Sequence, residues 1–258
     1  MYWYNGREIA KDTIELNISE PGLLYGATVF TTLRTDRLSP IVAELHYQRL
    51  RSSIIDLAWF QPNWAQLQQG VSALAPKFPV LRITIFPDGR ELITGRDLPP
   101  QLAIWKTQGV TVTIADGQYS RSYPQHKTGN YLAPWLALQQ ARRQDIQEAI
   151  LTTDRGDWLE TTTGNLWGYL DGCWYTPPLS SGILPGVMRS AILTHLQQQQ
   201  IPVIETAWNS DWVKGLEAIG YSNSVIHLIP IHTVLTPMGK LEYKTQHPAI
   251  TWLVNCEL

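Results

Sequence analysis

A segment containing glycine and paired prolines, residues 94–101, divides the chain into two blocks of different pattern. Gly95, Pro99 and Pro100 interrupt regular structure there, so the segment is predicted to be a domain linker. Strand-like and helical stretches are mixed in both blocks, which favours an α+β protein. We therefore expect one domain over residues 1–103 and a second over residues 104–258.

The first block has the pattern of short strands around one long helix. Asn5-Gly6 predicts a hairpin turn between short strands, and residues 29–33 and 81–86 have strand composition. Apolar side chains at helical spacing predict a helix over residues 42–59. Arg49 shares part of the apolar stripe of that helix, and an arginine at such a position is expected to need an anionic partner.

The second block alternates strands and helices. Helices are expected over residues 130–144 and 187–198, the latter behind Pro185-Gly186. Asp171-Gly172 predicts a second hairpin turn. Strands are expected at residues 110–115, 148–153, 166–170, 173–176, 203–206, 218–222 and 228–235.

Composition excludes several classes of protein. The chain of 258 residues has a formal net charge of −2, which provides no general attraction for nucleic acid or an anionic membrane. No apolar run reaches the roughly 20 residues of a membrane span. Two cysteines are too few for a disulfide scaffold and lack zinc-site spacing, so a soluble cytoplasmic protein without a metal is expected.

Three features could carry chemistry. Lys127 lies in a loop that opens a helix, where a buried lysine could form a Schiff base. Glu160 follows a strand-like stretch and, if buried, would need a cationic partner. Residues 182–189 place glycines and a proline at a helix start, where backbone N–H groups favour phosphate. Taken singly, each feature is more often structural than functional: a solvated lysine, an exposed acid and a simple helix start.

In combination and order, these residues resemble the class IV, or fold-type IV, pyridoxal-phosphate aminotransferase family, which includes aminodeoxychorismate lyases. The similar segments span nearly the whole chain and are residues 22–26, 30–34, 46–50, 127–132, 160–166, 175–177, 182–189, 222–224 and 229–231. The resemblance implies a small α/β domain and a larger pseudo-barrel domain. It also implies pyridoxal 5'-phosphate (PLP) in the cleft between them and a homodimer.

Site roles follow from the resemblance by position. Lys127 matches the lysine that binds the cofactor covalently, Glu160 the partner of its ring nitrogen, and Tyr131 the tyrosine near its 3-oxygen. The residues that match the phosphate site are Arg49, Val187, Met188 and Ser224.

The resemblance leaves two reactions open. Phe30-Thr31-Thr32, Asn223 before Ser224 and Tyr175-Thr176-Pro177 are similar to aminodeoxychorismate lyases, which make 4-aminobenzoate and pyruvate in folate biosynthesis. Ala27-Thr28 departs from the Asp-Gly often found there, and Tyr131 is shared with aminotransferases. The alternative is therefore an aminotransferase for branched-chain or D-amino acids.

The lyase hypothesis assigns catalytic and substrate-binding roles to further residues. Lys127 would move the substrate proton with help from Thr32, and Asn223, Arg82 and Arg90 would bind substrate. A third alternative is a non-catalytic protein that binds small molecules. It is disfavoured because it would not need Lys127, Glu160 and Arg49 together.

Overall fold

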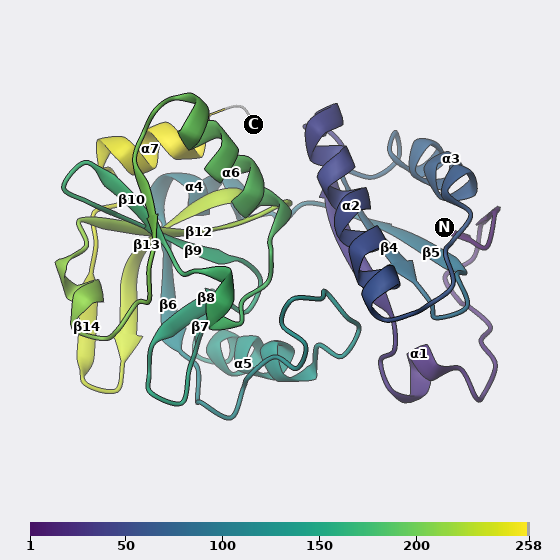
Figure 1. Cartoon of the computed structure of the whole chain (residues 1–258), viewed down its shortest axis with the longest axis horizontal. Coiled ribbons are helices and arrows are strands. Elements are labelled where there is room, and N and C mark those ends of the chain that lie inside the picture. The colour runs from purple at the N-terminus through teal and green to yellow at the C-terminus, as the bar shows by residue number, and fades with distance from the viewer. Residues whose placement is uncertain (257–258) are drawn as a thin grey trace. The chain divides into compact units, whose positions relative to one another are not determined.

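A computed structural model describes residues 1–256, which form two compact units (Figure 1). The first unit comprises Met1–Pro99 together with His126–Tyr131, and the second comprises Pro100–Gln125 and the chain from Leu132 onward. The short segment around Lys127 thus packs with the first unit although its neighbours in sequence belong to the second.

The first unit contains an antiparallel sheet in the order β2-β1-β5-β4-β3. The strands are β1 (Tyr2–Tyr4), β2 (Arg7–Ile9), β3 (Val29–Arg34), β4 (Val80–Ile85) and β5 (Glu91–Arg96). The predicted hairpin is confirmed, with Asn5 and Gly6 at φ of 46° and 80°. The linker prediction is wrong for residues 94–96, which belong to β5. Gly95 is needed within this strand because a β-carbon there would lie 2.1 Å from the Phe78 ring.

Helices α2 (Pro40–Asp56) and α3 (Trp64–Leu74) pack on the sheet of the first unit, and a short helix α1 (Pro21–Leu24) precedes β3. The side chain of Ser39 caps α2 by accepting a hydrogen bond from the Val42 amide, so the helix begins slightly earlier than predicted. It also ends earlier, at Asp56. Alternate strand residues, including Leu33 of β3 and Ile83 of β4, join Leu50 of α2 in the core. Helix α3 was not predicted.

The second unit is built on a sheet with the order β11-β10-β9-β12-β13-β6-β7-β8. A further pairing between β8 and β9 closes part of this sheet into a barrel, and β14 pairs with β13. The pairs β10–β11, β13–β6 and β6–β7 are parallel. The strands are β6 (Val110–Ile114), β7 (Glu148–Thr152), β8 (Trp158–Thr161), β9 (Asn165–Leu170), β10 (Cys173–Thr176), β11 (Val203–Glu205), β12 (Ala218–Asn223), β13 (His227–Thr236) and β14 (Gly239–Glu242).

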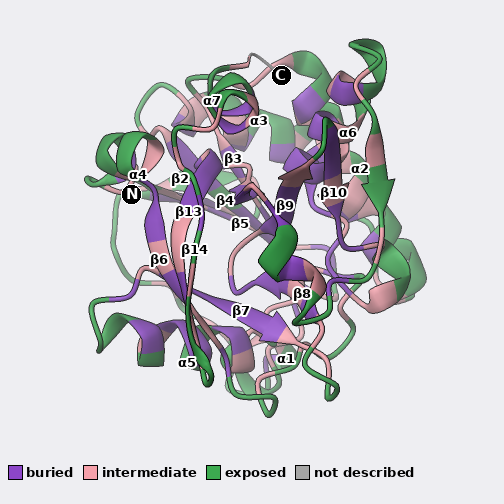
Figure 2. Ribbon diagram, turned by 90° about the vertical axis from the view of Figure 1, so that its left-hand side faces the viewer, coloured by how far each residue is buried: buried purple, intermediate pink, exposed green. Residues whose placement is uncertain are grey.

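Four helices of the described chain cover this second sheet, and Figure 2 shows β7 buried while the outer side of α5 is exposed. They are α4 (Leu102–Gln108), α5 (Leu132–Arg142), α6 (Val187–Gln198) and α7 (Pro248–Asn255), with single turns at Leu179–Ser181 and Trp212–Gly215. Helix α6 has the predicted bounds, whereas α5 begins after Tyr131, later than predicted.

The mixture of helix and strand, with one barrel-like and one separate sheet, confirms the expected α+β fold. No helix within residues 1–256 is long and apolar enough to cross a membrane.

Candidate active site

The backbone on both sides of Lys127 is paired with the start of β3. The carbonyl of Lys127 accepts from the Phe30 amide at 2.8 Å, and the Gly129 amide donates to the Thr28 carbonyl at 2.7 Å. A β-carbon at Gly129 would lie 2.3 Å from Oγ1 of Thr28, so this close approach requires glycine. The pairing fixes Lys127 to the sheet of the first unit.

The Lys127 amine lies beside two aromatic rings. Its Nζ is 4.8 Å from the ring centre of Phe30 and 4.9 Å from that of Tyr131, and the two rings meet edge to face at 5.9 Å. Arg82 stacks on Phe30 with its Cζ 3.5 Å from the ring centre. Lys127, Tyr131 and Arg82, all predicted as site residues, are therefore brought together around Phe30.

Strand alternation places Thr32 on the same sheet face. Side chains two residues apart on a strand share a face, so Thr32 accompanies Phe30, and it stands opposite Arg82 in the β3–β4 register. Arg90 belongs to a different group, because its guanidinium contacts Glu20, Asp88 and the hydroxyl of Tyr4. A substrate role for Arg82 or Arg90 stays a prediction, and the contacts of Arg90 explain it as a structural residue.

Arg49 lies near the opposite, core-facing side of β3. Its Nη2 donates to Oγ1 of Thr31 at 2.5 Å, and the same oxygen is 2.6 Å from Nδ1 of His46. Thr31 and His46 are both fully buried. Burial, together with the charges of Arg49 and Lys127, holds the pKa of His46 well below its usual value of 6.5. This contact of Arg49 is with a neutral hydroxyl, and the predicted anionic partner stays a prediction.

Glu160 is buried in β8 of the second unit, with 4 % of its surface exposed. One carboxylate oxygen accepts from Arg121 Nη1 at 2.8 Å, and the other accepts from the Leu184 amide at 3.1 Å. The predicted cationic partner is thus present as Arg121, which sequence analysis missed. An ionised carboxylate has about four acceptor positions, so these two donors leave it able to bind another.

The loop before α6 lies against the same region. Asn165 donates from Nδ2 to the Leu184 carbonyl at 2.9 Å, and a β-carbon at Gly186 would lie 2.0 Å from its Oδ1. The first backbone hydrogen bond of α6 runs from the Ser190 amide to the Gly186 carbonyl. No described side chain caps this N-terminus, so the amides of Val187 and Met188 stand at the positive end of the helix dipole.

The turn that carries Ser224 is held by Asn223. Oδ1 of Asn223 accepts from the amides of Val225 and Ile226 at 3.0 and 3.1 Å. Its Nδ2 donates to the Thr163 carbonyl at 3.2 Å. These bonds give Asn223 a structural function in the turn, and its substrate role stays a prediction.

Glu148 is a second buried carboxylate that sequence analysis missed. It accepts from the hydroxyls of Thr162 and Thr163 and from the Ala149 amide at 2.9 Å. Burial raises the pKa of Glu148 above its usual value of 4.5 in spite of these donors. Glu148 therefore anchors the turn that follows Glu160.

The residues that sequence analysis missed are Thr31, His46, Arg121 and Glu148. Each is explained by a partner distant in sequence, such as Glu160, 39 residues from Arg121. Thr31 and His46 lie in segments that resemble the family but were given no role there, and Glu148 was signalled only as a polar side chain in an apolar strand pattern. That signal identifies an unusual position but does not name its partner.

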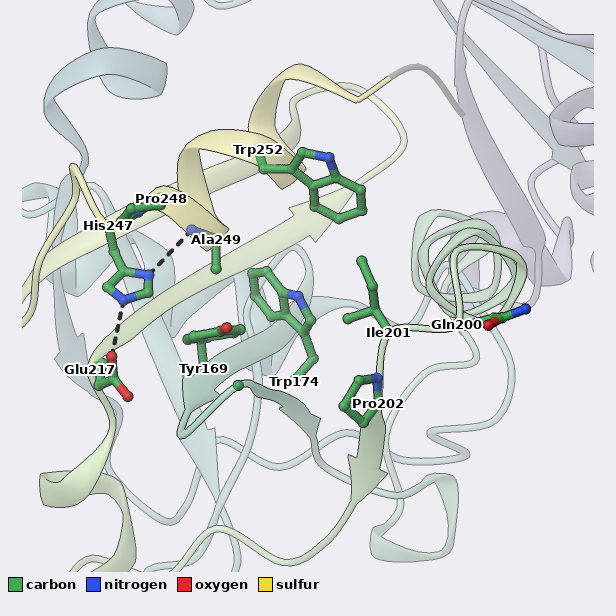
Figure 3. Close-up of a pocket in the computed structure, with 11 residues that line it drawn as sticks. Tyr169, Trp174, Gln200, Ile201, Pro202, Glu217, His247, Pro248, Ala249 and Trp252 are labelled. Atoms are coloured by element: carbon green, nitrogen blue, oxygen red, sulfur yellow. Dashed lines mark hydrogen bonds and ion pairs between the residues drawn. The ribbon is translucent and has the colours of Figure 1, made fainter.

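A separate pocket of about 720 Å³ lies in the second unit and involves none of the predicted site residues (Figure 3). Tyr169, Trp174 and Trp252 contribute aromatic surface to it. Its polar groups bind one another, because His247 Nε2 is 3.0 Å from Glu217 and Nδ1 accepts from the Ala249 amide at 3.3 Å. The described residues that line this pocket include no lysine or arginine, which the predicted site uses to bind its ligand.

Comparison with known proteins places these groups in a family context. The chain is 20 % identical to an aminodeoxychorismate lyase of Vibrio harveyi, covering 94 % of both chains. It is 24 % identical to a branched-chain-amino-acid aminotransferase of Escherichia coli, covering 90 % of this chain and 84 % of that one. A PLP-bound structure of a hypothetical aminotransferase from Mycobacterium tuberculosis superposes with a TM-score of 0.84 at 18 % identity, covering 99 % and 97 % of the two chains.

The family profile described as amino-transferase class IV matches residues 28–234. This range includes β3 with Thr31, the Lys127 segment, Glu160, the start of α6 and the turn at Ser224. The match confirms the resemblance drawn from the sequence, and the relatives include both lyases and aminotransferases. The chain therefore belongs to the class IV aminotransferase family of enzymes.

Proposed function

We propose that this protein is a PLP-dependent 4-amino-4-deoxychorismate lyase that forms 4-aminobenzoate and pyruvate. The observation that carries the proposal is the position of the Lys127 amine over the ring of Phe30, on the sheet face that also bears Thr32. Phe30-Thr31-Thr32 is the segment that resembles lyases rather than aminotransferases.

The residues present fit PLP. Helix α6 begins at Val187 without a described side-chain cap, so the amides of Val187 and Met188 would be able to donate to a phosphate at the helix start. Glu160 is buried and paired with Arg121, and its carboxylate has acceptor capacity left for a protonated ring nitrogen. In this proposal Arg49 and Ser224 also bind phosphate, Tyr131 contacts the 3-oxygen, and Lys127 binds the cofactor covalently.

The chain's own residues would perform the proton transfers. When bound, PLP would supply an electron sink that acidifies the substrate C4–H bond. Lys127 would take that proton as the C–O bond to the neighbouring enolpyruvyl group breaks, and would return it to the methylene carbon of the leaving group. Pyruvate then leaves, and the ring keeps the amino group as 4-aminobenzoate. Thr32, on the same face, would assist the second transfer.

The test supplies the cofactor-loaded protein with enzymatically generated aminodeoxychorismate and no 2-oxo acid. Formation of 4-aminobenzoate and pyruvate in equal amounts, at a rate proportional to enzyme, would support the lyase. Lys127→Ala is the matched control and should form neither product. Absence of product from a protein that binds PLP would contradict the lyase proposal.

A class IV aminotransferase acting on branched-chain or D-amino acids is the second candidate. It is favoured by the 24 % identity to a branched-chain-amino-acid aminotransferase over 90 % of this chain. Here Lys127 would return the proton to the cofactor carbon, and the amino group would pass to an acceptor. Glutamate formation from leucine or D-alanine with 2-oxoglutarate would favour this candidate. For either reaction we propose a homodimer, which analytical ultracentrifugation tests.

A further inference from the structure

A buried polar triplet lies under β3 in the first unit, formed by Thr31, His46 and Arg49. Thr31 comes from the core-facing side of β3, and the other two come from consecutive turns of α2. Thr31 Oγ1 is within 2.6 Å of both His46 Nδ1 and Arg49 Nη2. Because Thr31 and His46 are fully buried, these bonds are made without competition from water.

The direction of these hydrogen bonds follows from donor chemistry. A guanidinium donates only, so the Thr31 oxygen is an acceptor toward Arg49. The hydroxyl proton then has His46 Nδ1 as its acceptor at 2.6 Å. This arrangement needs a neutral His46 with its proton on Nε2. Nε2 has no described hydrogen-bond partner in either tautomer, whereas the reverse tautomer would also remove the Nδ1 acceptor of the hydroxyl proton, which costs more.

The triplet therefore orients one edge of the Arg49 guanidinium. His46 fixes the rotation of the Thr31 hydroxyl, and the hydroxyl lone pair in turn fixes Arg49 Nη2. Planar recognition of an anion by arginine depends on such orientation, because the guanidinium presents its N–H groups in a rigid fork. A neutral hydroxyl orients the cation without cancelling its charge, as a carboxylate would.

We propose that Thr31 and His46 are positioning residues that hold Arg49 for the phosphate of the cofactor. This inference rests on the proposed PLP site but is independent of whether the reaction is elimination or amino transfer. The competing explanation is that the hydrogen bond between Thr31 and His46 only pairs two buried polar groups in the core and has no effect on Arg49.

The test compares binding of PLP and of pyridoxal, which lacks the phosphate, to the apoprotein. Affinities are followed by the absorbance of the lysine-bound cofactor in the wild type, Thr31→Val, Thr31→Ser and Arg49→Ala. Thr31→Val removes the hydroxyl at nearly constant volume, and we expect it to weaken PLP about tenfold while pyridoxal affinity changes less than about twofold. Thr31→Ser keeps the hydroxyl and should bind PLP as the wild type does.

A double variant tests whether Thr31 affects PLP affinity through Arg49. In the Arg49→Ala background, Thr31→Val should cause no further loss of PLP affinity, because its effect acts through Arg49. Equal weakening of PLP and pyridoxal, or additive losses in the double variant, would overturn the inference. If Thr31→Val does not fold, His46→Leu, which removes the Nδ1 acceptor together with the rest of the ring, is expected to show the same selective loss of PLP affinity.

The outcomes separate this inference from the proposed function. A wild-type protein that binds neither PLP nor pyridoxal would overturn the PLP site itself. A wild type that prefers PLP, with Thr31→Val and His46→Leu retaining that preference in full, would overturn only the positioning role.

Discussion

The two compact units hold their charged side chains in different ways. In the first unit, Lys127 and Arg82 lie against aromatic rings, and Arg49 donates to the neutral hydroxyl of Thr31. In the second unit, the buried carboxylates Glu160 and Glu148 are each surrounded by donors. A buried carboxylate is costly unless donors surround it, whereas aromatic rings and a neutral hydroxyl contact a cation without adding an opposite formal charge.

The largest expected effect concerns Lys127. Lys127→Ala should abolish turnover, a loss of at least about 10³-fold, because general acid–base catalysis alone contributes about 10²–10⁴. It should also remove the absorbance band of lysine-bound PLP. Lys77→Ala, at a surface lysine paired with Glu8, is the control and should leave both unchanged. A retained band in Lys127→Ala would mean that another lysine binds the cofactor.

The second prediction tests the buried ion pair between Glu160 and Arg121 in the second unit. Glu160→Gln leaves the nearly buried Arg121 without its counter-charge, so urea unfolding should show a loss of about 3–5 kcal/mol. Adding Arg121→Met should recover part of that stability. Asp211→Asn, which breaks an exposed pair with Lys214, should have little effect. If Glu160→Gln and Asp211→Asn behaved alike, the contrast between buried and exposed pairs would fail.

The third prediction is a pH dependence in the first unit. The pKa of His46 is lowered on folding, so between its folded pKa and 6.5 the unfolded chain binds more protons than the folded one. Stability contributed by neutral His46 is therefore present above pH 6.5 and declines as the pH falls below it. His46→Leu should flatten this decline in urea titrations from pH 7 to pH 5. An unchanged slope would contradict the buried, neutral state of His46.

The smallest effect is expected from Glu148, with the opposite sign. Its pKa is raised on folding, so above 4.5 the folded state holds its proton longer than the unfolded state does. The contribution of Glu148 is thus complete below pH 4.5 and declines as the pH rises through the raised pKa. Glu148→Gln should reduce this decline, measured by thermal unfolding at several pH values. A steeper decline in Glu148→Gln would contradict the assignment.

Local sequence predicted several elements well. The bounds of α6 follow from Pro185-Gly186 ahead of an apolar periodic run, and Asn5-Gly6 and Asp171-Gly172 are turn signals that act within a few residues. Helix α3 was missed although Asn63 caps it and Leu67 and Leu74 have helical spacing. Residues 94–96 were misjudged because Gly95 signals a break, whereas in the structure it accommodates the ring of Phe78.

By itself, the sequence determined the family, many of the strands and the helix start at Val187, and it predicted site roles for Lys127, Glu160 and Arg49, which stay predictions. These rest on short motifs, whose spacing along the chain is itself the signal. Only the tertiary structure decided that Arg121 neutralises Glu160, that the Lys127 segment pairs with β3, and that His46 and Thr31 orient Arg49. These contacts join residues 15 or more positions apart, so burial and hydrogen-bond geometry, rather than local pattern, select the partners.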